Sequence, residues 1–373
     1  MRPVAAASIF LVLAFLMALK YMISEYLRRI RGKNSDSTFT TLTIDEFLDG
    51  IEREKPIRFS AEQLILATGN FASLLGTGGF GAVYKGMFSD GTPVAVKVLH
   101  GSSDKKIEEQ FMAEVGTIGR VHHFNLVRLY GFCFERNMRA LVYEYMSNGS
   151  LDRFLFHDNK IIGFEKLCEI AVGTAKGLAY LHEECQQRIV HYDIKPGNIL
   201  LDEKFFPKVA DFGLAKLCNR DNTHITMTGG RGTPGYAAPE LWMPYAITHK
   251  CDVYSFGMLL FEIIGRRRNL DTNLPEKDRE VAERFMKAAL WCVQSRPESR
   301  PLMSTVVKML EGSMEIPSPL NPFPNLFEQT TGPEPPSHFL SNSSIFESTT
   351  VTGSKVEHST PVMTKYEIHM ATT

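Results

Sequence analysis

The chain has 373 residues, of which 44% are hydrophobic and 22% charged, a composition typical of a globular protein with one large or two moderate domains. Its 41 basic and 42 acidic residues nearly cancel, so the charge gives no indication of nucleic-acid binding. No two of the six cysteines form a Cys-x-x-Cys pair, which argues against a zinc site or a disulfide framework and favours free thiols in a reducing compartment.

An apolar run near the N-terminus predicts a membrane anchor. Residues 4–19 carry no charged side chain, and apolar residues resume after Lys20 up to position 23. A bilayer span needs roughly 20 apolar residues, so the run is just long enough. Basic residues cluster at positions 28–33, whereas Arg2 alone precedes the run, and this bias places the rest of the chain in the cytoplasm. We predict a single-pass transmembrane helix at residues 4–23 and a juxtamembrane linker at 24–57.

Two alternatives stay open for this run. A cleaved secretory signal is consistent with the charge before the run and with the alanines inside it. A buried helix is the third interpretation, although the sequence indicates nothing for it to pack on. The basic cluster that follows the run favours the anchor.

Residues 75–83 form a glycine-rich stretch, LGTGGFGAV, with glycines at positions 76, 78 and 81. Such spacing is a weak signal by itself, because hairpin turns and dinucleotide loops share it. Asp90-Gly91 predicts a turn between the two β-rich runs around it, whereas a dinucleotide loop would open a helix. The stretch therefore predicts a hairpin loop whose missing Cβ atoms let backbone amides approach phosphates.

Lys97 ends the apolar run VAVK and is expected to have a buried carboxylate partner and to pair with phosphates. The helical spacing of Phe111, Val115 and Ile118 predicts a helix after it. That helix offers three candidate partners, which spacing alone does not distinguish: Glu108, Glu109 and Glu114.

Residues 191–213 gather the side chains that phosphoryl transfer requires. Asn198 follows Asp193 by five residues, and an Asp-Phe-Gly begins at Asp211, thirteen residues after Asn198. Asp193 is suited to orient the attacking hydroxyl and accept its proton, and Asn198 and Asp211 are suited to hold Mg²⁺, or Mn²⁺ in its place. Lys195 can neutralise charge near the transferred group.

Helices are predicted around this stretch at residues 164–185, 251–265, 280–293 and 303–312 from their apolar faces. Asp252 is expected to brace the backbone of the 191–198 loop, and Arg300 to pair with Glu240. From residue 313 to 373 the composition shifts to proline, serine and threonine, which predicts a disordered tail with phosphorylatable hydroxyls.

Together these motifs resemble a protein kinase and, more narrowly, a plant receptor-like kinase. The similarity covers about residues 58–312 and includes VHHFNLVRLYGFC, LVYEYMSNGSLDRFLF, RGTPGYAAPE and SRPESRPLMSTVVKMLEG. IVHYDIKPGNILLD is similar to the rust-resistance-kinase-like and thaumatin-like-receptor group. The resemblance implies an α+β, two-lobed kinase fold, with a β-rich small lobe up to about residue 145 and a mostly helical large lobe.

The resemblance also assigns roles within the site. It selects Glu114 as the partner of Lys97, places Tyr143 beside the adenine, and lets Lys195 and Thr233 indicate a Ser/Thr rather than a Tyr kinase. The catalytic residues implied are Asp193 and Lys195, and the metal ligands are Asn198 and Asp211. The ATP-binding residues implied are Leu75, Gly76, Thr77, Gly78, Gly79, Phe80, Gly81, Ala82, Val83, Ala95, Lys97, Glu114, Glu144, Met146 and Leu200.

Tyr192 departs from the family pattern, because most kinases have an arginine there that pairs with a phosphorylated activation-segment residue. A tyrosine carries no charge for that pair. We therefore expect that Thr226 and Thr228 are not obligatory switches, so that their double replacement by alanine leaves the folded protein active.

Two segments are also shorter than in the family. A segment with its own helix is expected between Glu240 and Arg300, but the chain after Asn269 enters the next helix directly, which would expose an apolar face and puts the substrate-docking surface in doubt. Only Met1 to Pro3 precede the apolar run, so direct sensing of an extracellular ligand is not expected.

Two functions are therefore predicted as alternatives. The first is an active, membrane-anchored Ser/Thr kinase that uses ATP and Mg²⁺, acts on protein substrates and works with other membrane kinases or co-receptors, with its kinase domain on the cytoplasmic side of the plasma membrane. The second is an ATP-binding pseudokinase or scaffold whose large lobe is incomplete. The first is favoured because every residue of the ATP and metal chemistry is present.

Overall fold

The computed structural model describes residues 56–79, 81–100, 104–157, 162–218, 232–242, 246–265 and 276–322. The predicted membrane helix at 4–23, the linker up to residue 55, Phe80, the threonines at 226 and 228, the stretch after Asn269 and the tail from 323 lie outside the described residues. The chain divides into two compact units. The first contains residues up to Val121 together with Arg128–Glu144, and the second contains His122–Val127 and the residues from Tyr145 on.

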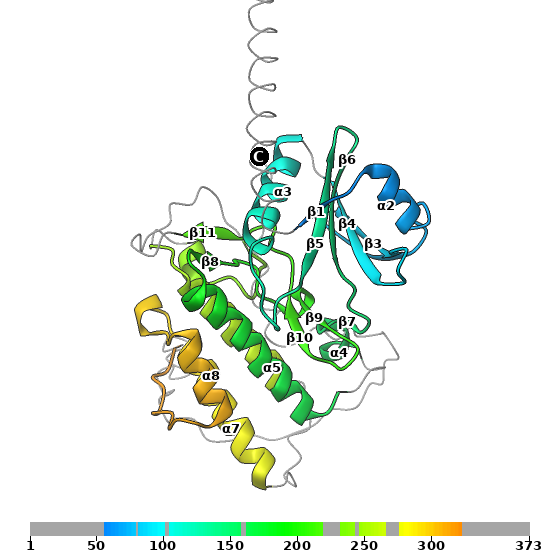
Figure 1. Cartoon of the computed structure of the whole chain (residues 1–373). Coiled ribbons are helices and arrows are strands. Elements are labelled where there is room, and N and C mark those ends of the chain that lie inside the picture. The colour runs from blue at the N-terminus through cyan, green and yellow to red at the C-terminus, as the bar shows by residue number, and fades with distance from the viewer. Residues whose placement is uncertain are drawn as a thin grey trace, which may run out of the picture. The chain divides into compact units, whose positions relative to one another are not determined.

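A six-stranded sheet forms most of the first unit, in the order β1-β5-β6-β4-β3-β2 (Figure 1). Its neighbouring strands are antiparallel, except that β1 runs parallel to β5. The strands are β1 Ile57–Arg58, β2 Leu74–Gly78, β3 Gly81–Met87, β4 Pro93–Leu99, β5 Leu129–Glu135 and β6 Met138–Glu144. Two helices accompany them, α2 Ala61–Ala67 and α3 Asp104–Ile118.

Local sequence explains how the first unit begins. The predicted turn at Asp90-Gly91 joins β3 to β4, and the Asp90 carboxylate accepts a hydrogen bond from the Thr92 N–H at 2.9 Å. Helix α2, which the sequence analysis did not anticipate, begins with a capping box in which Ser60 and Gln63 exchange side-chain to backbone hydrogen bonds. Its buried Leu64 joins the apolar cluster of the sheet, so α2 covers one part of the sheet's surface.

The second unit is mostly helical (Figure 1). Its helices are α4 Asp152–Leu155, α5 Phe164–Ala179, α6 Lys250–Gly265, α7 Glu276–Cys292 and α8 Met303–Glu311. A π-helical turn, Tyr180–Glu184, follows α5, and short 3₁₀ turns lie at Pro196–Asn198, Pro239–Leu241 and Pro297–Ser299. Short strands form two small sheets, β10-β9-β7 and β11-β8, from β7 Gly149–Ser150, β8 Arg188–Val190, β9 Ile199–Leu201, β10 Pro207–Val209 and β11 Lys216–Cys218.

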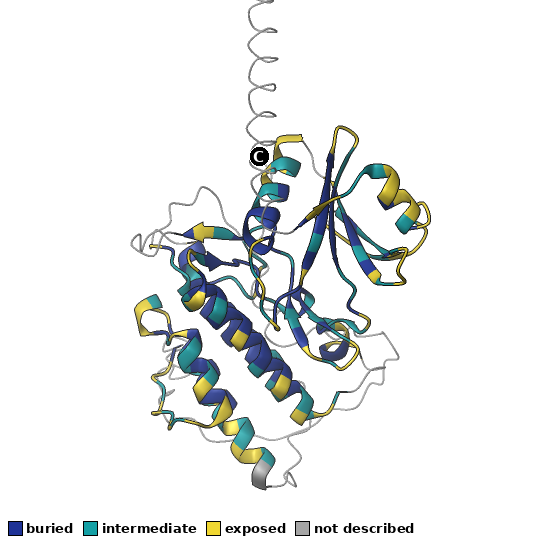
Figure 2. Cartoon of the chain, in the orientation of Figure 1, coloured by how far each residue is buried: buried dark blue, intermediate teal, exposed yellow. Residues whose placement is uncertain are grey.

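Helices α5 and α6 supply the core of the second unit. Both helices are rich in apolar side chains, which have no hydrogen-bonding groups that need partners. Figure 2 shows α5 buried along most of its length. The predicted helices at 164–185, 251–265, 280–293 and 303–312 are confirmed, with the first changing to a π-helical turn at Tyr180. The described residues thus form the expected α+β architecture.

None of the helices in the described ranges is both long enough and apolar enough to cross a bilayer. All six cysteines lie in the described residues, and each is a free thiol, as predicted.

Candidate functional site

The glycine-rich stretch lies on the β2–β3 hairpin, where Gly78 pairs with Gly81. A Cβ added at Gly76, Gly78 or Gly79 would meet no atom within 4 Å, so open space lies above the backbone there. Gly81 is different, because its φ of 135° and a carbonyl 2.1 Å from its would-be Cβ, that of Val98, both require glycine. The hairpin itself explains Gly81, while the other three leave the backbone accessible to a ligand.

The burial of the flanking residues that are predicted to bind ATP varies from one residue to the next along the same strands. Leu75 and Val83 are half-buried, Thr77 is exposed and Ala82 is buried. Ala95 lies on β4, half-buried and opposite Tyr143 of β6.

Lys97 on β4 forms a buried ion pair with Glu114 of α3, with 2.5 Å between Lys97 Nζ and Glu114 Oε1. The two rival carboxylates are engaged elsewhere, since Glu108 pairs with Arg139 and Glu109 with Lys105. Lys97 lies between Val83 and Leu141 in the sheet register, so its charge is held at a fixed point on an apolar surface. The pair implied by the resemblance is therefore present in the first unit.

Tyr143 adds a contact that sequence reasoning missed. Its hydroxyl donates a hydrogen bond to the second carboxylate oxygen of Glu114, so β6 as well as β4 holds α3. The next residue, Glu144, ends β6, and its N–H and side chain bond the backbone of Arg128 at 3.0 and 2.8 Å.

In the second unit, the Met146 carbonyl accepts a hydrogen bond from Gly149, and Leu200 lies half-buried on β9. These positions leave the predicted adenine contacts of Glu144, Met146 and Leu200 as predictions.

The carboxylate of Asp193 is held by three side chains. Oδ2 accepts a hydrogen bond from Asn198 Nδ2 at 2.9 Å and lies 2.8 Å from Lys195 Nζ, while Oδ1 accepts one from the Thr233 hydroxyl at 2.6 Å. Lys195 Nζ also donates to Thr233 Oγ1 at 2.8 Å. The result is a closed ring of contacts that fixes the carboxylate and places a positive charge beside it.

Asn198 and Asp211 carry the kind of oxygen atoms that a divalent cation binds. Asn198 uses its amide nitrogen for both of its bonds to Asp193, so its side-chain oxygen faces no donor among the described residues. The backbone carbonyl of Asn198 accepts the N–H of Ala210, which brings the residue before Asp211 to the same loop. Asp211 has a φ of 65°, an unusual conformation that an aspartate tolerates better than most residues. One amide oxygen and one carboxylate are hard ligands of the kind Mg²⁺ takes.

Asp252 of α6 braces the loop that carries Asp193, as predicted. Its two carboxylate oxygens accept the N–H groups of His191 and Tyr192 at 2.7 and 2.8 Å, and Oδ2 also lies 2.9 Å from His182 Nε2. Burial alone would raise the pKa of the Asp252 carboxyl, but the hydrogen bonds and the charge of His182 and His191 lower it below its usual value. A buried, ionised Asp252 therefore fixes the loop backbone.

Tyr192, the departure from the arginine pattern, is 2% exposed and belongs to an apolar cluster with Val190, Leu241 and Ile247, among others. Its φ is 68°. The side chain at this position therefore packs into an apolar core. An arginine that pairs with a phosphate would instead need a pocket open to that phosphate.

The predicted pair of Arg300 and Glu240 is confirmed as a buried, two-pronged ion pair, with N–O distances of 2.6 and 2.9 Å. Arg300 also donates to the carbonyls of Gln294 and Lys250. It joins the turn that contains Glu240 to the start of α6 and to the residues that follow α7.

Comparisons with known proteins agree with this geometry. A family described as protein tyrosine and serine/threonine kinase matches residues 70–310. The chain is 42% identical over 318 residues to the rust resistance kinase Lr10 of Triticum aestivum, covering 76% of this chain and 50% of the relative. It is 46% identical over 309 residues to the G-type lectin S-receptor-like serine/threonine-protein kinase SD2-5 of Arabidopsis thaliana, covering 74% of this chain and 37% of the relative. The chain thus spans half the length or less of these relatives.

Proposed function

Because the chain belongs to the family of protein tyrosine and serine/threonine kinases, we propose that it transfers the γ-phosphoryl group of ATP to serine or threonine side chains of proteins. The observation that carries this proposal is the carboxylate of Asp193, held by Lys195, Asn198 and Thr233. The names of the relatives, which include serine/threonine-protein kinases, support the choice of hydroxyl acceptor.

Asp193 has the properties of the residue that receives the substrate hydroxyl. Its oriented carboxylate can accept a hydrogen bond from that hydroxyl and then its proton, and Lys195 beside it offers positive charge to the transferred group. Asn198 and Asp211 are the residues that would hold Mg²⁺, which neutralises phosphate charge when bound. A protein kinase domain implies ATP and a divalent cation in general, and Mg²⁺ is our choice among the cations.

The first unit has the properties of a phosphate-binding hairpin. The open backbone at Gly76, Gly78 and Gly79 can receive phosphate oxygens, and Lys97, whose position is fixed by Glu114, supplies a positive charge on the same sheet. Ala95, Leu200 and the backbone at Glu144 and Met146 remain the predicted adenine contacts.

We further propose that residues 4–23 anchor the chain in the plasma membrane as a single-pass helix, with the kinase domain in the cytoplasm. The uncharged run followed by basic residues supports this placement. Protein substrates and other membrane kinases or co-receptors are the partners that such a receptor-like arrangement implies, and no nucleic acid is among them.

A catalytically weak scaffold is the competing candidate, and the short connection after Asn269 favours it. The alignment with Lr10 has 318 positions, which is more than 76% of the 373 residues here. The relative therefore has residues with no counterpart in this chain. Such a protein would bind Mg-ATP without transferring phosphate.

Autophosphorylation of the full chain with Mg-ATP, beside the Asp193→Asn variant, distinguishes the two functions. We expect phosphate incorporation in the natural chain and at least a hundredfold less in Asp193→Asn, with equal thermal stability of the two proteins. A chain that gains thermal stability with Mg-ATP but incorporates no more phosphate than Asp193→Asn would reject the kinase and favour the scaffold.

A further inference from the structure

Residues 313–322 follow α8 and lie along α7, and we call them the strap. Side chains of α7 and of the residues just after it bond backbone carbonyls at the end of α8 and in the strap. The three pairs are Arg284 with Leu310 at 3.2 Å, Trp291 with Pro317 at 3.0 Å and Gln294 with Leu320 at 2.9 Å. In each pair the carbonyl lies 26 residues after the donor, so the strap runs in the same direction as α7.

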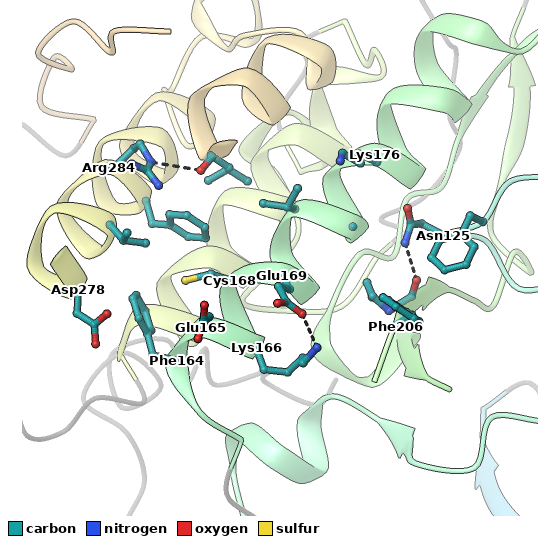
Figure 3. A pocket seen from close by; sticks show the side chains of 17 residues that line it. Asn125, Phe164, Glu165, Lys166, Cys168, Glu169, Lys176, Phe206, Asp278 and Arg284 are labelled. Atoms are coloured by element: carbon teal, nitrogen blue, oxygen red, sulfur yellow. Dashed lines mark hydrogen bonds and ion pairs between the residues drawn. The ribbon is translucent and has the colours of Figure 1, made fainter. Parts of the chain in front are cut away.

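The strap begins where α8 ends against α7. The bond from Arg284 Nε to the Leu310 carbonyl is one of the dashed lines in Figure 3, and both residues line the groove drawn there. Gly312 then turns the chain with a φ of 74°, and both the N–H and the hydroxyl of Ser313 bond the carbonyl of Lys308. The start of the strap is therefore fixed by the end of α8.

The far end of the strap is held by its backbone and by a proline. The Leu320 side chain is 71% exposed, yet its carbonyl accepts the bond from Gln294. Pro322, two residues further on, is buried. A change of the Leu320 side chain should therefore spare the strap, whereas a charge at Pro322 should detach its end.

Gln294 connects the strap to another partner. It is 6% exposed and follows the end of α7 at Cys292, so helical hydrogen bonds do not set the direction of its carbonyl. Its side-chain amide donates to the carbonyls of Leu290 and Leu320, and its own carbonyl accepts a bond from Arg300 Nε at 2.8 Å. The residue that binds the strap thus also helps to hold Arg300.

From Arg300 a series of contacts leads to the proposed catalytic carboxylate. Arg300 pairs with Glu240 at 2.6 and 2.9 Å. Three residues before Glu240, the N–H of Ala237 bonds the carbonyl of Thr233 at 3.0 Å. The Thr233 hydroxyl in turn donates to Asp193 Oδ1 at 2.6 Å. All of these residues belong to the second unit.

We propose that the strap positions the Asp193 carboxylate through this series of contacts, so that detaching the strap from α7 slows phosphoryl transfer. The inference rests on the proposed function and adds to it a positioning element outside the site. A continuous series of hydrogen bonds gives such coupling a physical basis, and variants measure its strength.

Hydrogen exchange of the full chain, followed by mass spectrometry, measures the coupling without any need for catalysis. Pro322→Asp places a charge at the buried end of the strap, and Gln294→Met removes the amide that binds the Leu320 carbonyl. In both variants the N–H of Ala237 should exchange about two- to tenfold faster, which is the effect of losing one hydrogen bond. Exchange in α5 should stay unchanged, which separates this effect from a general loss of stability.

Leu320→Asp is the matched control for the strap. It adds the same charge two residues before Pro322, on an exposed side chain, and leaves the carbonyl in place. Exchange at Ala237 should therefore equal that of the natural chain.

Steady-state phosphorylation of a serine-containing protein substrate measures the effect on the reaction. In Pro322→Asp, kcat per folded molecule should fall about two- to tenfold. The KM for Mg-ATP should not change, because the series of contacts ends at Asp193 and not at the glycine hairpin. Pro322→Asp added to Gln294→Met should lower kcat no further than Gln294→Met alone, since both variants break the same connection.

The proposal is overturned if exchange at Ala237 is unchanged in both strap variants, if Leu320→Asp acts like Pro322→Asp, or if the losses of kcat add in the double variant. An unchanged kcat in an active chain would overturn it as well. A natural chain that incorporates no more phosphate than Asp193→Asn would instead reject the proposed function, and faster exchange at Ala237 would then still support the coupling of the strap to this turn.

Discussion

The hydroxyl of Thr233 touches the proposed catalytic carboxylate and its neighbouring lysine at once. It donates to Asp193 Oδ1 and accepts from Lys195 Nζ, although it lies forty residues after Asp193 in the chain. A methyl group in its place would leave both charged groups with one partner fewer and free to change rotamer.

We predict that Thr233→Ala lowers kcat/KM for a serine-containing protein substrate about 10- to 100-fold, since a hydrogen bond to a charged group contributes about 1.5–3 kcal/mol. Thr233→Ser keeps the hydroxyl and should recover most of the activity. Steady-state phosphorylation rates of the full chain measure both. Equal rates for the alanine and serine variants would show that the hydroxyl has no role in positioning Asp193.

His249 is a second residue whose surroundings set its chemistry. Burial, helped by the nearby His182, Arg188 and Lys250, lowers the pKa of its imidazole to about 3, against the smaller opposing effect of Asp252. Its Nε2 and the Nδ1 of His182 are buried without a hydrogen-bond partner in the described part of the chain. The imidazole is therefore neutral in the folded protein well below the pH at which an exposed histidine gains its proton.

This lowered pKa predicts a pH-dependent stability. Between about pH 6.5 and pH 3 the unfolded chain binds a proton at His249 that the folded chain does not, so stability falls as the pH falls. The slope is at most about 1.4 kcal/mol per pH unit for one proton. His249→Gln should flatten the slope of the unfolding free energy between pH 6.5 and 4.5 in urea titrations, whereas the exposed His157→Gln should not. An unchanged slope in His249→Gln would contradict the prediction.

At the scale of the elements, one arginine holds three segments together. They are the turn at Pro239–Leu241, the start of α6 and the segment before α8. Arg300 is 1% exposed and makes two bonds to Glu240 and one each to the carbonyls of Gln294 and Lys250. A planar guanidinium with five N–H groups can serve these directions together, and an ammonium group cannot.

Arg300→Ala should therefore destabilise the chain by about 3–5 kcal/mol, because Glu240 would stay buried without its partner. Arg300→Lys should recover only a part of that loss. Arg279→Ala on the exposed face of α7 is the control, with an expected change below about 0.5 kcal/mol. Urea unfolding followed by tryptophan fluorescence measures the differences, and a loss under about 1 kcal/mol in Arg300→Ala would refute this account.

For the whole molecule, the first question is where the chain resides in the cell. If residues 4–23 span a membrane, the protein should stay in the membrane pellet after an alkaline carbonate wash. Leu11→Arg together with Phe15→Arg should move it to the soluble fraction, since each charge at the centre of a span costs about 2.5–3.5 kcal/mol.

The matched control for this prediction places the same two charges in the linker, as Thr38→Arg with Thr40→Arg, and should leave the protein in the pellet. Mass spectrometry of the intact protein distinguishes the cleaved signal. A mature chain that lacks its first twenty or so residues would replace the anchor with that alternative.

Those parts of the site that lie within one short stretch of chain were predictable from sequence. The glycine hairpin and the spacing of Asp193, Asn198 and Asp211 are local patterns, because loop geometry and metal chemistry restrict which residue types can occur a few positions apart. The longer helices were predictable for the same reason, since the apolar face of each repeats along its own sequence, whereas the short helix α2 was not predicted. Even so, the sequence could not reveal that Gly81 serves the hairpin rather than a ligand.

Spacing along the chain could not by itself decide between candidate partners that lie far apart in the sequence. Three glutamates were candidates for Lys97 by spacing, the family resemblance selected Glu114, and the packing of α3 on the sheet brings Glu114 to Lys97 and also to Tyr143. The contact of Thr233 with Asp193 likewise joins residues that are forty positions apart in the chain, so it depends on the tertiary fold. Sequence determined which chemistry the chain carries, because residue type sets charge and hydrogen bonding. Folding decided which groups act together, because a contact between distant residues depends on the packing of every element between them.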